Sequence, residues 1–156
     1  MKGKFQWNLE LVINAKPARV WEIIDDVTLI PRYHPEVGKV NLISGQSKRA
    51  AGVKYQCNIL EGRKGSCVEE VVEYIPLVKI STGMVEDTWG MDKIFSDFIV
   101  ESSIIPKDDR TTMLKFDAFY NPVGLFYKVL NALMLRRMMK KRSFLVMKGI
   151  KKLSEE

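Results

Sequence analysis

The sequence predicts an α+β fold, in which a curved sheet of seven antiparallel strands is covered by one long C-terminal helix. Three observations predict it: an alternating N-terminal strand, a run of strand-like segments separated by turns, and a C-terminal stretch without a helix breaker. The 156 residues, of which 46% are hydrophobic and 28% charged, suit one domain with a sizeable core. No Pro/Gly/Ser-rich linker or repeat divides the chain, so residues 1–156 are expected to form a single domain.

The N-terminal region reads as a strand followed by two short helices. In residues 5–13 apolar side chains alternate along the chain, which is typical of a strand with one buried face. Pro17 suits the first turn of a helix, because its missing N–H would have no partner there. Pro31 and Pro35 limit the second helix to a turn or two. The apolar residues of the first helix recur at helical spacing: Val20, Trp21, Ile24 and Val27.

The middle of the chain reads as an antiparallel meander, because its strand-like segments have short connections. The last segment shows the pattern well, since Leu114, Phe116, Ala118 and Tyr120 share one face. After Pro122 no strong breaker appears before Gly149, so 123–153 is expected to be one helix laid across the concave side of the sheet. The six predicted strands are 38–44, 52–60, 65–75, 77–84, 93–105 and 111–120.

Two stretches carry a resemblance to a known family. INAKPARVWEIIDDVTLIPRYHPEV at 13–37 and the ending NPVGLFYKVLNALMLRRMMKKRSFLVMKGIKKLSEE, with the strands between them, resemble the START-like (SRPBCC) superfamily. This is the helix-grip fold of birch-pollen-allergen-like proteins, polyketide cyclase/dehydrase-like proteins and lipid-transfer domains. The resemblance spans about Phe5 to Leu153. It implies a cavity between the sheet and the long helix that accepts an apolar or amphipathic small molecule.

The resemblance implies two functions for that cavity. The first is binding, and possible transport, of a hydrophobic or amphipathic molecule such as a lipid or polyketide. The second is an enzyme of the cyclase/dehydrase or hydratase type. A uniformly apolar wall would favour carriage, whereas a polar group deep among apolar walls would favour catalysis, because desolvation raises the pKa of a carboxylate.

The ligand-binding residues follow from strand parity, from the helix and from the resemblance. Tyr33 and His34 are expected near the mouth of the cavity, because the two short helices close the open end of this fold. His34 either caps a surface turn or contacts the polar end of a ligand. The other wall residues either enclose the cavity or pack on one another and leave none. They are Tyr55, Ile80, Met84, Phe98, Phe116, Tyr120, Phe126, Leu130 and Met134.

Signals for catalysis are sparse. One histidine excludes a cluster of His ligands, and there is no nucleophile elbow or phosphate-binding Gly-rich loop. No catalytic residue or cofactor is therefore predicted. Acid–base chemistry would have to use a buried carboxylate or one of a few other groups. These are His34, Glu36, Tyr55 and Tyr120.

The strand at 65–75 leaves its register open. In one register Glu70 points inward with Val68, Val72 and Tyr74. In the other register Cys67, Val71 and Ile75 point inward, and Glu69 and Glu73 are the polar residues that point inward with them. An outward, solvated Glu70 is the simpler expectation.

Cys57 and Cys67 would face each other across two strands if the hairpin turns near residues 61–64. They would then form either a disulfide or two buried thiols. Their spacing is not that of a zinc site, and no metal is predicted. Because the N-terminus lacks a secretory signal and the most apolar stretch contains Lys128, the expected location is cytoplasmic, where thiols stay reduced.

The charge is concentrated near the C-terminus. The chain carries a net charge of +6 with a pI near 9.3, and most of the excess lies in LRRMMKKRSFLVMKGIKKL. These lysines are either a solvated face or a stripe that meets an anionic membrane beside the apolar patch from Phe126 to Met134. Nucleic acid is not the expected partner, since no base-stacking platform accompanies the charge. The expected membrane contacts are Arg137, Lys140, Lys141 and Lys148.

Overall fold

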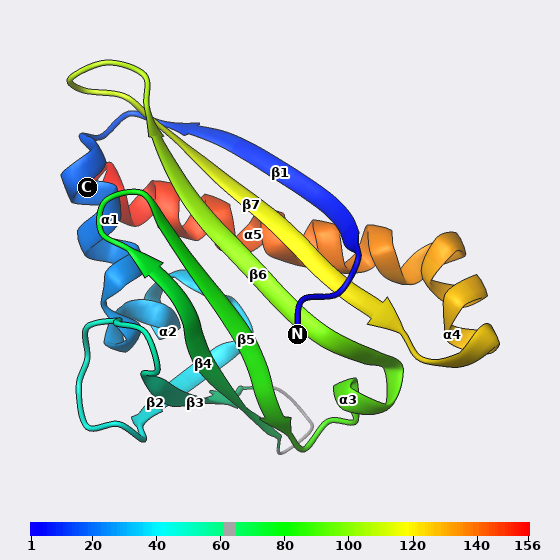
Figure 1. The fold of residues 1–156 in the computed structure, drawn as a ribbon. Coiled ribbons are helices and arrows are strands. Elements are labelled where there is room, and N and C mark those ends of the chain that lie inside the picture. The colour runs from blue at the N-terminus through cyan, green and yellow to red at the C-terminus, as the bar shows by residue number, and fades with distance from the viewer. Residues whose placement is uncertain (61–64) are drawn as a thin grey trace.

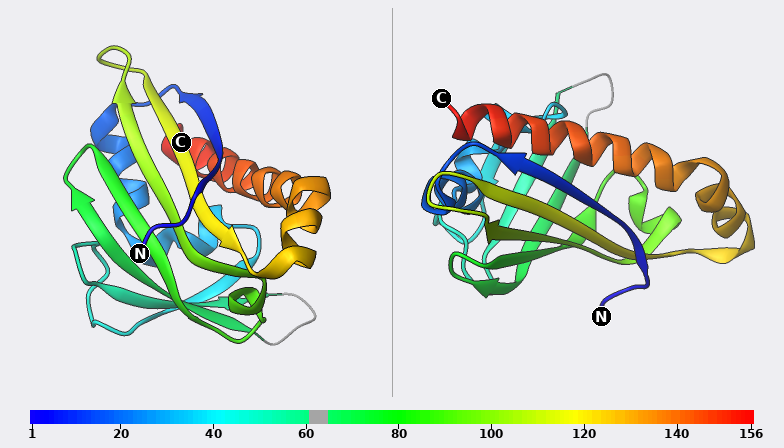
Figure 2. Two further views of the ribbon diagram at one scale, coloured as in Figure 1. Left: turned by 45° about the vertical axis from the view of Figure 1, so that its right-hand side comes forward. Right: turned by 90° about the horizontal axis from the view of Figure 1, so that it is seen from above.

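A computed structural model describes residues 1–60 and 65–156 and confirms the predicted helix-grip architecture (Figure 1). The seven strands form one antiparallel sheet in the order β1-β7-β6-β5-β4-β3-β2. The sheet is curved, and the C-terminal helix crosses its concave side (Figure 2). The strands are β1 (Phe5–Ile13), β2 (Val37–Leu42), β3 (Lys54–Ile59), β4 (Ser66–Ile75), β5 (Lys79–Asp87), β6 (Phe95–Pro106) and β7 (Thr112–Pro122).

The predicted strand segments match the observed strands to within a few residues at each end. Before β6 a short helix, α3 (Met91–Ile94), replaces the predicted start of the strand. The predicted hairpin turn near residues 61–64 lies outside the described residues. In β7 the alternation predicted from the sequence is observed, because residues 112, 114, 116, 118 and 120 are buried and their neighbours are partly exposed.

Three short helical elements connect β1 to β2: α1 (Pro17–Asp25), the 3-10 turn η1 (Val27–Leu29) and α2 (Ile30–Tyr33). Pro17 occupies the first turn of α1, as predicted. The buried side of α1 consists of Val20, Trp21, Ile23, Ile24 and Asp25. The apolar members of this set belong to the single core that also contains the concave face of the sheet.

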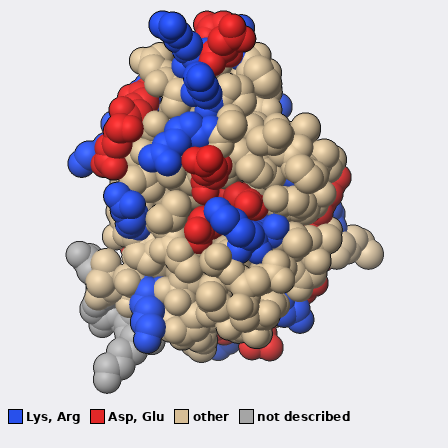
Figure 3. All heavy atoms as spheres, turned by 90° about the vertical axis from the view of Figure 1, so that its left-hand side faces the viewer, with Lys and Arg blue, Asp and Glu red and all other residues tan. Residues whose placement is uncertain are grey.

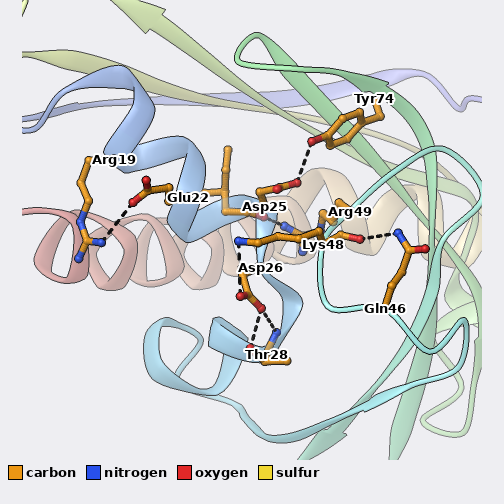
Figure 4. A network of polar contacts seen from close by, with 10 residues as sticks. Arg19, Glu22, Asp25, Asp26, Thr28, Gln46, Lys48, Arg49 and Tyr74 are labelled. Carbon is orange, nitrogen blue, oxygen red and sulfur yellow. Dashed lines mark hydrogen bonds and ion pairs between the residues drawn. The ribbon is translucent and has the colours of Figure 1, made fainter.

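The loop between β2 and β3 is attached to the end of α1 (Figure 4). The N–H of Arg49 donates to the carbonyl oxygen of Asp25 at 2.9 Å. The Lys48 ammonium lies 3.5 Å from the Asp26 carboxylate, and the Tyr74 hydroxyl donates to the Asp25 carboxylate at 3.0 Å. These bonds hold a long loop against α1 and β4, and they thereby fix the position of Arg49.

The C-terminal helical segment runs through α4 (Gly124–Leu130), a π-helical turn η2 (Asn131–Leu135) and α5 (Arg136–Ser154). In η2 the buried Asn131 accepts a hydrogen bond from the Tyr120 hydroxyl at 3.0 Å and donates to Gln6 Oε1 at 3.2 Å. A π turn contains an extra residue, so it changes the helix face that follows it. α5 lies across the sheet, whereas α4 extends past its end (Figure 2). No described helix is long and apolar enough to cross a membrane.

Candidate functional site

A cavity of about 270 Å³ lies between the concave face of the sheet and α5. Strands β3 to β7 line one side, and α5 and the segment from α2 to β2 line the other. This volume is just below the range of about 300–1,000 Å³ that is usual for small-molecule pockets. Its apolar wall consists of Ile24, Ile30, Val37, Met84, Trp89, Met91, Phe98, Val100, Phe116, Met139, Val146 and Ile150.

The cavity reaches the surface beside an ion pair between α5 and the start of β2. The Nε of Arg142 lies 3.3 Å from Oε1 of Glu36, and both side chains line the cavity while staying partly exposed to solvent. His34 and Ser143 also line the cavity. The structure therefore places the α2–β2 connection, including His34, along the cavity wall.

The structure places the predicted wall residues in three groups. Tyr33, His34, Tyr55, Met84, Phe98 and Phe116 line the cavity. Ile80 and Tyr120 are fully buried but pack in the core beside it, and the Tyr120 ring stacks on Phe98 with centroids 5.3 Å apart. Phe126, Leu130 and Met134 do not line it.

The sequence predicts that the first half of the long helix faces the cavity. In the structure α4 does not line the cavity. Phe126 is 71% exposed and Met134 is 51% exposed, and Leu130 is half-buried against the core. The second half supplies the wall instead, through Met139, Val146 and Ile150. The physical reason is that α4 extends past the sheet, while α5 crosses it.

A chain of polar groups, centred on the buried Tyr55 and flanked by the partly buried Arg49 and Glu69, interrupts the apolar wall. Nη2 of Arg49 donates to the Tyr55 hydroxyl at 2.9 Å, and that hydroxyl donates to Oε2 of Glu69 at 2.6 Å. Nη1 of Arg49 donates to the carbonyl oxygen of Ile24. The buried Nε of Arg49 has no hydrogen-bond partner among the described residues. Arg49 and Glu69 are therefore opposite charges held on either side of one tyrosine hydroxyl in the cavity wall.

Burial shifts the titration of the groups around this chain. Burial and the nearby Glu69 carboxylate raise the pKa of Tyr55, and burial raises the pKa of Tyr33, although the Arg49 charge opposes both shifts. Burial lowers the pKa of His34, against the opposing effect of Glu69. Because Nδ1 of His34 accepts a hydrogen bond from the Glu36 N–H at 3.2 Å, the neutral ring carries its proton on Nε2. Both tyrosines and His34 are thus neutral donors at neutral pH.

The structure decides the register of β4. Glu69 faces the cavity, whereas Glu70 points away from it and pairs with Lys54 at 3.6 Å. An outward Glu70 was the simpler prediction. An irregularity at Val71/Glu73 breaks the alternation of the strand after Val71, so Glu73 pairs with Lys79 at 2.7 Å and Ile75 is exposed.

Cys57 and Cys67 face each other across β3 and β4 as two free, buried thiols. A hydrogen bond with Cys67, together with burial and the Glu69 charge, raises the pKa of Cys57. The sulfurs and a Glu69 oxygen lie within 4.8 Å of one another, which is a donor set that Zn²⁺ can use. In this structure the Glu69 carboxylate accepts the hydrogen bond of the Tyr55 hydroxyl.

Sequence reasoning missed Arg49 and left the direction of Glu69 open. Arg49 lies in the polar loop SGQSKRAAG, whose composition gives no sign of a buried side chain. Glu69 belongs to a run of acidic and apolar residues in which parity alone left two registers open. Trp89 and Met91, which also line the cavity, lie in and beside a short helix that the sequence pattern did not show.

The fold resembles solved structures of low sequence identity. The Zhui aromatase/cyclase from Streptomyces sp. R1128 aligns with a TM-score of 0.75 and 14% identity, over 96% of this chain and 92% of that one. Norcoclaurine synthase from Thalictrum flavum, solved with dopamine and hydroxybenzaldehyde, aligns with a TM-score of 0.71 and 16% identity, over 94% and 84%. TTHA0849 from Thermus thermophilus has a TM-score of 0.72 and 17% identity, over 94% of both chains. These likenesses confirm the fold.

No curated protein sequence matches this chain, but a family model does. The model described as polyketide cyclase/dehydrase and lipid transport matches residues 6–155. Because that match covers nearly the whole chain, the protein belongs to the polyketide cyclase/dehydrase and lipid transport family.

Proposed function

We propose that this protein binds and carries an amphipathic small molecule in the cavity beneath α5. The observation that supports this most is the largely apolar wall of the cavity, in which the chain Arg49–Tyr55–Glu69 is the polar exception. Small-molecule pockets commonly combine an apolar lining with a few polar groups that fix the orientation of the ligand. The polar end of the ligand would lie against this chain, and its apolar part against Met84 and Phe116.

A second observation supports a small ligand. The cavity volume of about 270 Å³ suits a small aromatic or short-chain molecule better than a two-chain lipid. Norcoclaurine synthase, which shares this fold, was solved with two small aromatic molecules. Tyr33 and His34 line the same cavity and can donate hydrogen bonds to the polar end of the ligand.

The test is binding of an apolar dye or a fatty acid, with an expected stoichiometry of one per chain, together with native mass spectrometry of gently purified protein. Phe116→Asp should weaken binding at least about tenfold, because a charge would enter the apolar wall without a partner. Phe119→Asp is the matched control, since Phe119 lies on the opposite face of β7 and contacts Phe5. Val100→Trp should block the cavity by volume alone. Unchanged binding in folded Phe116→Asp and Val100→Trp proteins would exclude this cavity.

A cyclase/dehydrase- or hydratase-type enzyme is the second candidate. It is favoured by the same polar chain, because Glu69 can accept a proton from a ligand carbon beside a carbonyl while Arg49 stabilises the negative oxygen. The fold likeness to an aromatase/cyclase is compatible with it. Mass spectrometry of the co-purified molecule after incubation separates the two functions. Conversion by the wild type but not by Glu69→Gln would support catalysis, and recovery of the same molecule from both would support carriage.

We also propose that the ligand is exchanged with an anionic membrane. Arg137, Lys140, Lys141 and Lys148 are all exposed on α5, and none pairs with an acidic side chain among the described residues. Basic residues near an anionic surface each contribute about 1 kcal/mol at most, and the attraction decays over a Debye length. Salt should therefore weaken this contact.

A further inference from the structure

The end of the long helix that projects past the sheet presents an apolar surface to solvent (Figure 2). Leu125 is 78% exposed, Phe126 71% and Leu133 69%. Single exposed apolar residues are common on proteins, but a contiguous patch marks an interaction site. We call this surface the α4 tip, and it consists of Val123, Leu125, Phe126, Val129, Leu133 and Met134.

Exposed residues of the tip lie on one side of the helical segment from α4 to η2, and that side faces solvent. Phe126, Val129 and Leu133 follow one another at helical spacing and all face solvent. The opposite side of the same helix is anchored to the body, through the buried Asn131 and its bonds to Tyr120 and Gln6. A helix anchored on one side and apolar on the other has its apolar side available for a partner.

The charges of the C-terminal segment have one sign. From Ala118 to Ser154 the chain contains nine lysines and arginines and no aspartate or glutamate, although the whole chain carries only +6. The rest of the chain is therefore net acidic. Lys128, Arg136 and Arg137 are exposed near the tip, and none forms an ion pair with the described residues. The face at the opposite end of the molecule instead shows basic and acidic side chains interspersed (Figure 3).

We propose that the α4 tip inserts into the interface of an anionic membrane, with Leu125, Phe126 and Leu133 among the acyl chains and Lys128, Arg136 and Arg137 at the level of the phosphates. Apolar area and basic charge together are the combination that binds such interfaces. An apolar patch ringed by unpaired bases suits anionic lipid better than a second copy of this chain, whose tip has the same charge. Lys148 lies farther along α5, over the Phe144 ring at 5.2 Å, and it adds only long-range attraction.

This inference names the surface that would enter the membrane, and its biological purpose rests on the ligand exchange proposed above. Vesicle binding by the tip and ligand binding in the cavity can be measured separately, since no residue of the tip lines the cavity. Failure of one proposal is therefore distinguishable from failure of the other.

The test is flotation of the protein with vesicles of phosphatidylcholine, alone and mixed with phosphatidylserine, at low salt. The wild type should bind only the mixed vesicles and dissociate as salt rises. The triple variant Leu125→Ser/Phe126→Ser/Leu133→Ser and the triple variant Lys128→Glu/Arg136→Glu/Arg137→Glu should each bind at least about tenfold less. Dye binding in the cavity should be unchanged in both.

Two control variants match these changes elsewhere. Val72→Ser removes an exposed apolar side chain from β4, and Lys39→Glu reverses an exposed charge on β2, away from the tip. Both should bind vesicles nearly as the wild type does. The proposal is overturned if the wild type ignores anionic vesicles at low salt, or if the serine variant binds them as well as the wild type. A wild-type dimer that the serine variant converts to a monomer would instead assign the tip to self-association.

Discussion

Gly149 on α5 lies directly against the backbone of Tyr33 on α2. A Cβ at position 149 would be only 2.2 Å from the carbonyl oxygen of Tyr33. Atoms that are not covalently bonded do not approach this closely, and a backbone oxygen cannot rotate away as a flexible side chain could. The two helices can therefore approach this closely only because residue 149 has no side chain. This contact holds Tyr33 and His34 along the wall of the cavity.

Gly149→Ala is expected to destabilise the protein although alanine favours helices. The methyl group should force α2 and α5 apart and lower the free energy of unfolding by about 1–3 kcal/mol. Urea denaturation measures this change. Lys152→Ala is the matched control, because Lys152 is exposed on the same helix. An unchanged urea midpoint for Gly149→Ala would show that the two helices do not touch here.

The free energy of unfolding should depend on pH through His34, the only histidine of the chain. Burial lowers the pKa of His34 below its ordinary 6.5, so the unfolded chain binds more protons than the folded chain just below pH 6.5. Stability should therefore fall as the pH drops from 6.5 towards the folded pKa, by at most about 1.4 kcal/mol per pH unit. His34→Gln should remove this slope between pH 6.5 and 5.

A second pH region provides the control for the histidine. Burial by itself would raise the pKa of Asp87, but backbone hydrogen bonds from residues 89–92 outweigh it and lower that pKa below the ordinary 3.8. A lowered carboxyl pKa stabilises the folded state above 3.8 and loses that effect as the pH falls further. This acid loss should persist in His34→Gln. If the variant keeps the slope between pH 6.5 and 5 as well, His34 does not cause it.

Tyr55→Phe is expected to weaken both stability and ligand orientation. It removes the hydroxyl that joins Arg49 to Glu69 and leaves buried polar groups without a partner, at a cost of about 1–3 kcal/mol. Tyr74→Phe removes a comparable hydroxyl that binds Asp25 outside the cavity. Both variants should unfold at lower urea. Only Tyr55→Phe should change the binding of a fatty acid relative to an uncharged apolar dye, and equal changes in both variants would remove Tyr55 from the proposed site.

The sequence alone determined the layers of this protein. The alternation at Leu114 and Phe116, the helix start at Pro17 and the unbroken stretch after Pro122 are local patterns, and local geometry sets them. The strand order also predicted that Cys57 and Cys67 face each other, because antiparallel neighbours pair residue by residue. These features depend on contacts near in sequence or on simple periodicity.

Only the tertiary structure decided the candidate site. Glu69 faces inward because the pairing of β4 with β3 and β5 selects the register in which Cys67 and Val71 also face inward, and Arg49 enters the cavity because its loop is bound to the end of α1. Phe126 faces solvent because the helix is longer than the sheet it crosses, which no helical periodicity reveals. The physical reason is common to all three, since burial depends on which distant segment lies opposite a residue, whereas periodicity records only which residues share a face.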